Sequence, residues 1–297
     1  MILQSATGGS AAYNHGNGFA AFGRSQKGAV LIKRILIAIP ALALLFAVIY
    51  FHGVVAKVVA GLVAALCIHE MMGTLGKNGA KPIRPIGYAY AALLVPAYEF
   101  VGGFTGVLLL TTAAAIGILI VLVVTGRNVK DGLATGLPML YPGVFWACFI
   151  AVVYLPKGAS QFMLLLLFAA AVLTDTFAYF TGMLIGKHKL IERISPKKTV
   201  EGAIGAAVFG AAGVTLFGAF AQASFGVDIP VYWYAVTGVV LSVLSQIGDL
   251  AASLVKRHCG IKDYGHIMGP HGGAMDRLDS VLFISPAVYA VALIAGM

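Results

Sequence analysis

Charged residues are scarce in this sequence, since only 10% of its 297 residues are Asp, Glu, Lys or Arg. An ordinary soluble domain has about a quarter of its residues charged. The mean hydropathy of +0.94 is likewise more apolar than that of an ordinary soluble domain. This scarcity excludes an ordinary soluble domain. It indicates an all-α, polytopic integral membrane protein, because helices satisfy their own backbone hydrogen bonds inside a bilayer.

Cysteine is scarce too. The three cysteines, Cys67, Cys148 and Cys259, share no close spacing, which argues against a disulfide framework and against a zinc site. The net charge of +9 does not indicate nucleic acid as a partner. Its basic residues stand in short segments between apolar runs, which is typical of loops that face an anionic leaflet.

Apolar runs long enough to cross a bilayer recur along the chain. We predict nine spans, at about 35–51, 54–72, 86–102, 105–125, 138–155, 161–185, 202–223, 230–250 and 280–297. Residues 1–29 hold no such run and are predicted to form a disordered tail rather than a cleaved signal peptide. We divide the remainder into amino-terminal transmembrane helices, 30–160, and a region expected to carry the chemistry, 161–297. The latter includes large polar loops at 186–201 and 251–279.

Loop charge sets the orientation that we expect. If the amino terminus is cytoplasmic and nine spans alternate, 18 of the 20 basic residues fall on the cytoplasmic side, and only Lys57 and Lys157 do not. The cytoplasmic groups are Arg24, Lys27, Lys33 and Arg34; Lys77, Lys81 and Arg84; Arg127 and Lys130; Lys187, Lys189, Arg193, Lys197 and Lys198; and Lys256, Arg257, Lys262 and Arg277. One span more or fewer would scramble this pattern. It places both large polar loops on the cytoplasmic face.

The densest polar stretch runs from Ser253 to Asp279. It contains the cations Lys256, Arg257, Lys262 and Arg277, the acids Asp263, Asp276 and Asp279, and a His271-Gly272-Gly273 turn. Carboxylates hold a hard divalent cation, whereas Lys, Arg and free backbone N–H groups hold phosphate oxygens. A Gly-rich turn that leads into a helix can cradle an anion. The stretch therefore indicates a site for a divalent ion and a phosphate compound.

Several acids have a structural alternative beside the functional interpretation. Asp249, at the end of the eighth predicted span, is either a metal ligand or a snorkelling helix-end acid, and Gly248 before it would admit another backbone or a phosphate. Asp276 and Asp279 share a helical face, where they either join the ion site or complement the helix dipole. Asp175, inside the sixth predicted span, is either functional or a helix–helix hydrogen-bonding partner.

A second basic segment, residues 193–202, lies before the seventh predicted span. Lys197 and Lys198 would hold a phosphate as point charges, and the alternative is a basic interfacial anchor. Ser195 and Thr199 are candidate helix caps. Glu70, which ends the second predicted span together with His69, is interpreted as an interfacial side chain.

The segment Ser253–Asp279 resembles the signature of the phosphatidate cytidylyltransferase, or CDP-diacylglycerol synthase, family. The residues that match are Ser253, Lys256-Arg257, Lys262-Asp263, His271-Gly272-Gly273 and Asp276-Arg277-Leu278-Asp279. Residues 195–202 resemble a second motif of the family, and Asp175 lies in a third. The similarity covers most of the chain from about residue 31. Two departures are the order Gly269-Pro270, where the family has Pro-Gly, and Val200, where Trp is common.

The resemblance implies transfer of a cytidylyl group from CTP to phosphatidic acid, which gives CDP-diacylglycerol and pyrophosphate. It implies Mg²⁺ as the cofactor, held by Asp249 and Asp276, with a monovalent cation such as K⁺ beside it. The residues expected to carry catalysis are Asp249, Lys256, Arg257, Lys262, Asp263, His271, Asp276, Arg277 and Asp279. Those expected to bind substrate are Asp175, Ser195, Lys197, Lys198, Thr199, Glu201, Gly272 and Gly273. The family also implies a homodimer in the bacterial inner membrane.

Other classes of function stay open at this point. A transporter of an anionic solute would fit nine spans and an intramembrane acid, but the chain has no internal repeat and its polar cluster lies in predicted loops. A CTP-dependent lipid kinase that acts on an isoprenoid alcohol would transfer the γ-phosphate and release CDP. A non-catalytic membrane scaffold would not require so many charged positions of the signature.

Overall fold

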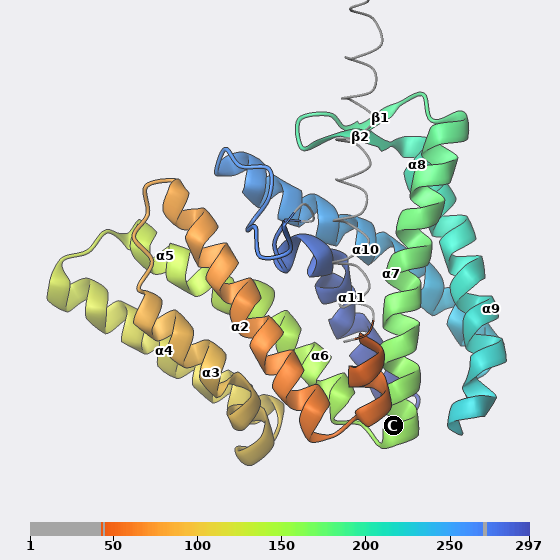
Figure 1. Ribbon diagram of the computed structural model, residues 1–297, viewed down its shortest axis with the longest axis horizontal. Coiled ribbons are helices and arrows are strands. Elements are labelled where there is room, and N and C mark those ends of the chain that lie inside the picture. Colours follow the sequence, from red (N-terminus) through yellow and green to blue (C-terminus); the bar gives the residue numbers. More distant parts are fainter. Residues whose placement is uncertain (1–42, 44, 270–271) are drawn as a thin grey trace, which may run out of the picture.

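The computed structural model describes residues 43, 45–269 and 272–297, and helices dominate it (Figure 1). The elements in chain order are α2 (Val54–Lys77), α3 (Arg84–Phe100), α4 (Phe104–Thr125), α5 (Val129–Pro138), η1 (Met139–Val144), α6 (Phe145–Val153), α7 (Lys157–Ile185), β1 (Lys189–Ile191), β2 (Ser195–Thr199), α8 (Val200–Gly205), η2 (Ala206–Gly210), α9 (Ala211–Ala221), η3 (Gln222–Phe225), α10 (Val231–His258) and α11 (Met275–Ile294). The predicted tail and most of the predicted span 35–51 lie outside the described residues.

Within the described residues, seven helical segments are long and apolar enough to cross a bilayer. They are Val54–Lys77, Phe104–Thr125, Val129–Val153, Lys157–Ile185, Val200–Phe225, Val231–His258 and Met275–Ile294. Each overlaps one predicted span. The predicted span 86–102 corresponds to α3, a helix of 17 residues. A helical, multi-span membrane protein is therefore confirmed, whereas the count of nine spans stays a prediction.

The connection between α3 and α4 is a tight helical hairpin. Gly102 and Gly103 take the left-handed φ values of 85° and 64°, which glycine adopts at little cost. The two helices run back alongside each other (Figure 1). The short gap between the predicted spans 86–102 and 105–125 allows either a tight hairpin or a broken helix, and the structure has the hairpin.

Both predicted polar loops need correction. Loop 186–201 contains a short antiparallel β-hairpin in which Lys189 lies opposite Thr199 and Ile191 opposite Ser195, and the hairpin connects two helices of a predominantly helical fold. Pro196 in this segment is unsuited to a helix interior, because proline has no backbone N–H to donate. Loop 251–279 is shorter than predicted, because α10 continues to His258 and α11 already begins at Met275. Charged side chains at a helix end reach water without ending the helix, and α10 stops just before Gly260, whose φ is 67°.

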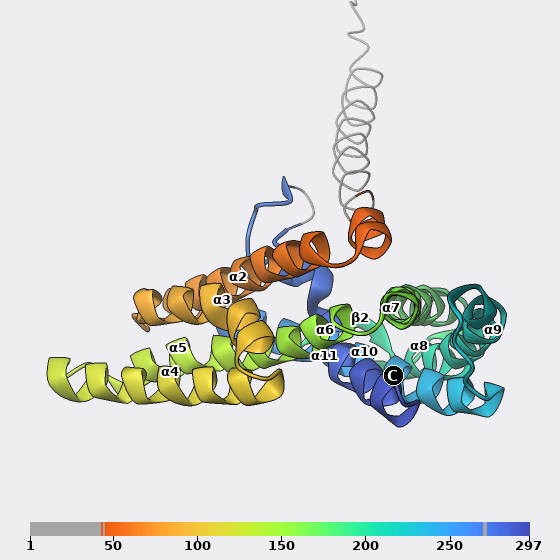
Figure 2. The same cartoon turned by 90° about the horizontal axis from the view of Figure 1, so that it is seen from below.

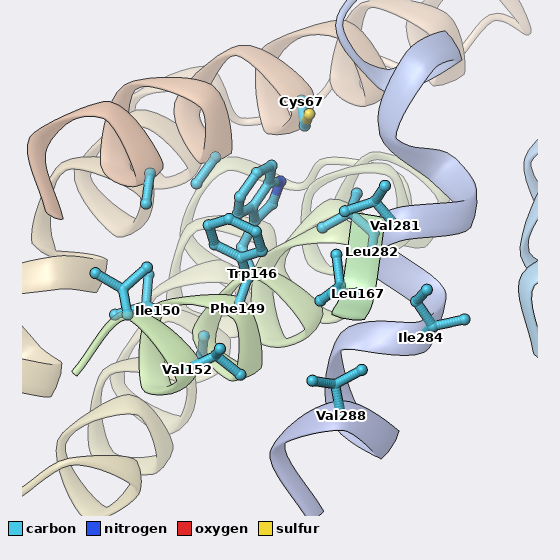
Figure 3. Close-up of a cluster of buried hydrophobic side chains, with 14 of the residues drawn as sticks. Cys67, Trp146, Phe149, Ile150, Val152, Leu167, Val281, Leu282, Ile284 and Val288 are labelled. Atoms are coloured by element: carbon cyan, nitrogen blue, oxygen red, sulfur yellow. The ribbon is translucent and has the colours of Figure 1, made fainter. Parts of the chain in front are cut away.

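The apolar core lies where α2, α6, α7 and α11 meet (Figure 3). Trp146 and Ile150 of α6 pack there with Leu167 of α7 and Leu282 of α11, and none of these side chains is more than 2% exposed. Lipid tails are as apolar as these residues, so close packing rather than transfer from water holds the helices together. This core fixes α11 between the two halves of the chain.

Figure 2 shows α2 to α5 on one side, α7 to α9 on the other, and α11 between them. The β-hairpin and the described residues between α10 and α11, 259–269 and 272–274, lie at the same end of the helices, where Arg257 Nε donates to the carbonyl oxygen of Ile194 at 3.4 Å. The other end holds Lys57, whose Nζ lies 2.7 Å from Glu99 Oε1. The two polar segments that the sequence predicted to share one face therefore do so.

Candidate active site

A cavity of about 580 Å³ lies where α7, β2, α8, α10 and α11 meet. Nine predicted site residues line it, namely Asp175, Lys197, Lys198, Thr199, Asp249, Lys256, Asp276, Arg277 and Asp279. Side chains of α7 such as Phe168, Val172 and Met183 give it an apolar wall. Four acids and four cations from separate parts of the chain thus face one space that has a hydrocarbon side.

Asp249 lies inside α10 and faces this cavity, so it is not a snorkelling acid at the helix end. Its Oδ2 lies 2.6 Å from Lys198 Nζ, and its Oδ1 accepts a hydrogen bond from Ser253 Oγ at 3.4 Å. The preceding Gly248 has no side chain because α11 packs there: a Cβ would lie 3.0 Å from the carbonyl oxygen of Asp279. The prediction that Gly248 admits another backbone is confirmed.

Asp276 lies in the first turn of α11, where three donors hold its carboxylate. Lys256 Nζ lies 2.8 Å from Oδ1, and the N–H groups of Tyr264 and Gly273 donate to Oδ2 at 2.7 and 2.9 Å. The Lys256–Asp276 pair is buried, with side-chain exposures of 11% and 5%. Backbone and lysine together therefore fix the direction of this carboxylate.

Two further acids complete the cavity. Asp279, one turn after Asp276 on α11, is 7% exposed, and its Oδ1 accepts from the Ser280 N–H at 2.8 Å. It lies close enough to Asp249 and Asp175 to interact electrostatically with both. Asp175 of α7 interacts in turn with Asp249 and Lys198. Carboxylates gathered in this way favour a bound cation, which relieves their mutual repulsion.

The β-hairpin brings Lys197 and Lys198 to the cavity, while its other predicted residues have different positions. Thr199 caps α8, since its Oγ1 accepts from the Gly202 N–H at 3.1 Å, as predicted. Glu201 accepts from the Lys187 N–H at 3.1 Å and lies 2.6 Å from His188 Nδ1, so it holds the entry of the hairpin. Ser195 opens β2 rather than capping a helix, and neither Ser195 nor Glu201 lines the cavity.

The described part of the connection between α10 and α11, residues 259–269 and 272–274, contributes less to the cavity than the sequence predicted. Lys262 and Asp263 belong to it, and neither they nor Arg257 line the cavity. Arg257 instead reaches the hairpin through Ile194. The predicted site residue His271 lies outside the described residues.

The predicted anion cradle is already engaged by acids of the chain itself. The N–H of Gly273 donates to Asp276, and those of Ala274 and Met275 donate to Glu70 at 3.1 and 2.9 Å. The Gly272 N–H donates to the carbonyl oxygen of Gly269. Gly272 and Gly273 do not line the cavity, so here they shape the backbone around carboxylates rather than around a phosphate.

Tyr264 anchors the same connection to α10. Its hydroxyl donates to the carbonyl oxygen of Ala252 at 2.9 Å, and Lys256 Nζ lies 5.3 Å from its ring centroid. Burial raises the pKa of Tyr264 far above its usual range, and the charges of Asp279 and Asp276 raise it further. The phenol therefore stays protonated and keeps its hydrogen bond.

Glu70 is the residue that the sequence interpretation missed. It was assigned to the membrane interface because the second span was predicted to end at residue 72. Helix α2 continues to Lys77, and Glu70 is buried against the start of α11. The general rule that an acid inside an apolar helix is functional until shown otherwise would have identified it.

The donors around the cavity suit a hard cation that arrives with a phosphate compound. Within the described ranges, no three His, Cys, Asp or Glu side chains converge closely enough to hold a metal unaided. Mg²⁺ is usually bound by one or two carboxylates together with substrate phosphates and water. Asp249 and Asp276 face one cavity and supply oxygen donors of that kind, so the residues present fit Mg²⁺.

Fold and cavity define a polytopic membrane protein with a charged site at one end of its helices. Residues 32–295 match the cytidylyltransferase family, and the chain belongs to that family. It is therefore an enzyme, a membrane-bound nucleotidyltransferase.

Three relatives illustrate the similarity, and each carries the name phosphatidate cytidylyltransferase. The protein of Staphylococcus haemolyticus is 30% identical over 259 residues, which cover 85% of this chain and 95% of the relative. That of Staphylococcus aureus (strain COL) is 31% identical over 261 residues, again 85% and 95% of the two chains. That of Bacillus subtilis (strain 168) is 40% identical over 156 residues, which cover 52% of this chain and 55% of the relative.

Proposed function

We propose that this enzyme transfers the cytidylyl group of CTP to phosphatidic acid and so forms CDP-diacylglycerol. The observation that carries the proposal is the cavity itself, in which Lys198, Lys256 and Arg277 face Asp249 and Asp276 beside an apolar wall. One substrate is a water-soluble triphosphate and the other a lipid phosphate. A charged cavity at the helix ends with a hydrocarbon side suits both.

The reaction requires two anions to meet. An oxygen of the phosphatidate phosphate forms a bond to the α-phosphorus of CTP. The bond from that phosphorus to the bridging oxygen of the β-phosphate breaks, and pyrophosphate leaves with the electron pair. The attacking oxygen is already anionic, so no strong base is needed. The barrier lies in repulsion and positioning, which fixed charges reduce.

The residues of the chain take separate parts in this step. Lys197 and Lys198, carried by the hairpin, and Lys256 and Arg277, on α10 and α11, bind phosphate oxygens. Asp249 and Asp276 would hold Mg²⁺, which would offset the negative charge that develops on the leaving pyrophosphate. Asp279 and Asp175 add negative charge beside Asp249, which suits a second, monovalent cation such as K⁺.

The apolar wall of α7 gives the lipid substrate its place. Phe168, Val172 and Met183 line the cavity, and Val172 and Met183 are also exposed on the helix surface that lipid would cover. Acyl chains can lie along this surface while the phosphate reaches the lysines. We place the cavity on the cytoplasmic side of a bacterial inner membrane, because the basic segments gather at this end of the helices. A homodimer is proposed from the family resemblance.

Labelled CTP tests the proposal directly. The full-length protein is purified in detergent, mixed with phosphatidic acid and Mg²⁺, and supplied with CTP labelled at the α-phosphorus or, in parallel, at the γ-phosphorus. We expect α-label in the lipid product and γ-label in pyrophosphate. Transfer of the γ-label to a lipid would indicate a kinase instead. Absence of label from lipid in both reactions would overturn the proposal.

A further inference from the structure

Glu70 is a buried carboxylate that none of the steps above uses. It is 6% exposed, and its two oxygens accept the N–H groups of Ala274 and Met275 at 3.1 and 2.9 Å. These donors are the first peptide groups of α11, whose N-cap residue Ala274 makes no capping hydrogen bond through its side chain. A carboxylate from α2 therefore caps α11, and the positive end of the helix dipole favours its charge.

Two glycines leave the space that this carboxylate fills. A Cβ on Gly265 would meet Glu70 Oε1, and a Cβ on Gly273 would meet both carboxylate oxygens. Gly265 and the backbone at the start of α11 thus pack around Glu70 from two directions. A larger residue at either position would displace the carboxylate from the helix start.

The backbone turn that Glu70 caps also carries Asp276 of the candidate active site. The Gly273 N–H donates to Asp276 Oδ2, and Met275, which donates to Glu70, immediately precedes Asp276. Asp279 follows one turn later on the same helix and lines the same cavity. Because an α-helix is stiff over a single turn, the place of its first peptide groups sets the direction of both acids.

We propose that Glu70 is a positioning residue, whose carboxylate sets the start of α11 so that Asp276 and Asp279 face the cavity. Its kinetic consequence rests on the proposed cytidylyl transfer, whereas the cap itself does not. The amino-terminal helices then take part in the site instead of only anchoring the chain.

Glu70→Gln is the sharpest variant, because it keeps the size of the side chain, removes the charge and replaces one acceptor by a donor. Glu99→Gln is the matched control, since Glu99 pairs with Lys57 at the opposite end of the helices. Each full-length variant is compared with wild type by thermal unfolding, by hydrogen–deuterium exchange of peptides covering 273–279, by Mn²⁺ binding in electron paramagnetic resonance, and by steady-state kinetics.

We expect Glu70→Gln to fold, to exchange faster at 274 and 275, and to bind Mn²⁺ more weakly. Its kcat should fall about 10- to 100-fold, as is usual when the partner of a metal-site residue is lost. The KM for phosphatidic acid should change little, because the lipid wall belongs to α7. Glu99→Gln should match wild type in all of these measurements.

Gly273→Ala approaches the same carboxylate from the other side. Gly73→Ala is its control, because a Cβ at Gly73 meets nothing within 4 Å. We expect Gly273→Ala to reproduce the faster exchange and the weaker Mn²⁺ binding, and Gly73→Ala to reproduce neither.

Faster exchange in Glu70→Gln with unchanged Mn²⁺ binding and unchanged kcat would mean a merely structural cap and would overturn the inference. Exchange equal to that of wild type would overturn it as well. A wild-type protein without cytidylyl transfer would contradict only the proposed function. Exchange and Mn²⁺ binding would then still decide the role of Glu70.

Discussion

The Nζ of Lys198 on β2 lies 2.6 Å from Oδ2 of Asp249 on α10, inside the cavity. Lys256 and Asp276 form a second such pair at 2.8 Å. Both acids are the proposed ligands of Mg²⁺, and both lysines are proposed partners of phosphate. Each lysine thus balances a carboxylate that a metal ion would otherwise balance. When a metal–nucleotide complex binds, each carboxylate would pair with the metal and each lysine with a phosphate. We call this change of partners the exchange.

Lys198→Met tests this exchange, because it removes the charge and keeps much of the side-chain length. We expect kcat/KM for CTP to fall about 100-fold, since a developing phosphate charge loses its partner. Mn²⁺ should bind more tightly without CTP, because Asp249 no longer pairs with an ammonium group. Lys187→Met is the control, since Lys187 lies in the same connection and does not line the cavity. Weaker Mn²⁺ binding in Lys198→Met would contradict the exchange.

The buried Lys256–Asp276 pair predicts a double-mutant result. Asp276→Ala should abolish turnover and also destabilise the protein by about 3–5 kcal/mol, because it leaves Lys256 charged and unpaired in a buried place. Lys256→Met combined with Asp276→Ala should recover part of the thermal stability without recovering turnover. Thermal unfolding in detergent and the transfer assay measure the two effects. An active Asp276→Ala enzyme would exclude the metal-ligand role.

The contact between Gly248 and α11 predicts a steric effect on the site. Gly248→Ala places a methyl group against Phe283 and the backbone of Asp279, which should destabilise the protein by about 1–3 kcal/mol. It should also lower kcat, because Asp249 moves together with the helix that carries it. Gly136→Ala, whose Cβ would meet only Ile118 at 3.9 Å, is the control. Equal activity in the two variants would argue that the spacing of α10 and α11 does not set the site.

The proposed orientation predicts which added cysteines react from outside the cell. The three native cysteines are buried, and burial raises the pKa of Cys259, so background labelling should be low. A membrane-impermeant maleimide should label Lys157→Cys in spheroplasts and Lys262→Cys only after permeabilisation. Both positions are exposed in the structure. The reverse labelling pattern would place the cavity on the outer side of the membrane and contradict the proposed orientation.

Sequence reasoning located the helices well, because a run of apolar residues is a local property. It failed where a boundary depended on contacts with the rest of the chain. The second span was predicted to end at residue 72, but helix α2 reaches Lys77. Glu70 therefore lies within the protein rather than at the membrane interface. The hairpin formed by 189–199 was missed because its short strands carry no alternating apolar pattern.

The sequence by itself determined that this is a helical membrane protein, and all eight charged residues that line the cavity were among its predicted site residues. Only the tertiary structure decided how those charges pair. Lys198 pairs with Asp249, and Glu70 accepts a hydrogen bond at the start of α11 from Ala274, which lies 204 positions later in the sequence. Such pairings depend on how helices cross and which faces they turn to one another, and that is a property of packing which no local pattern contains.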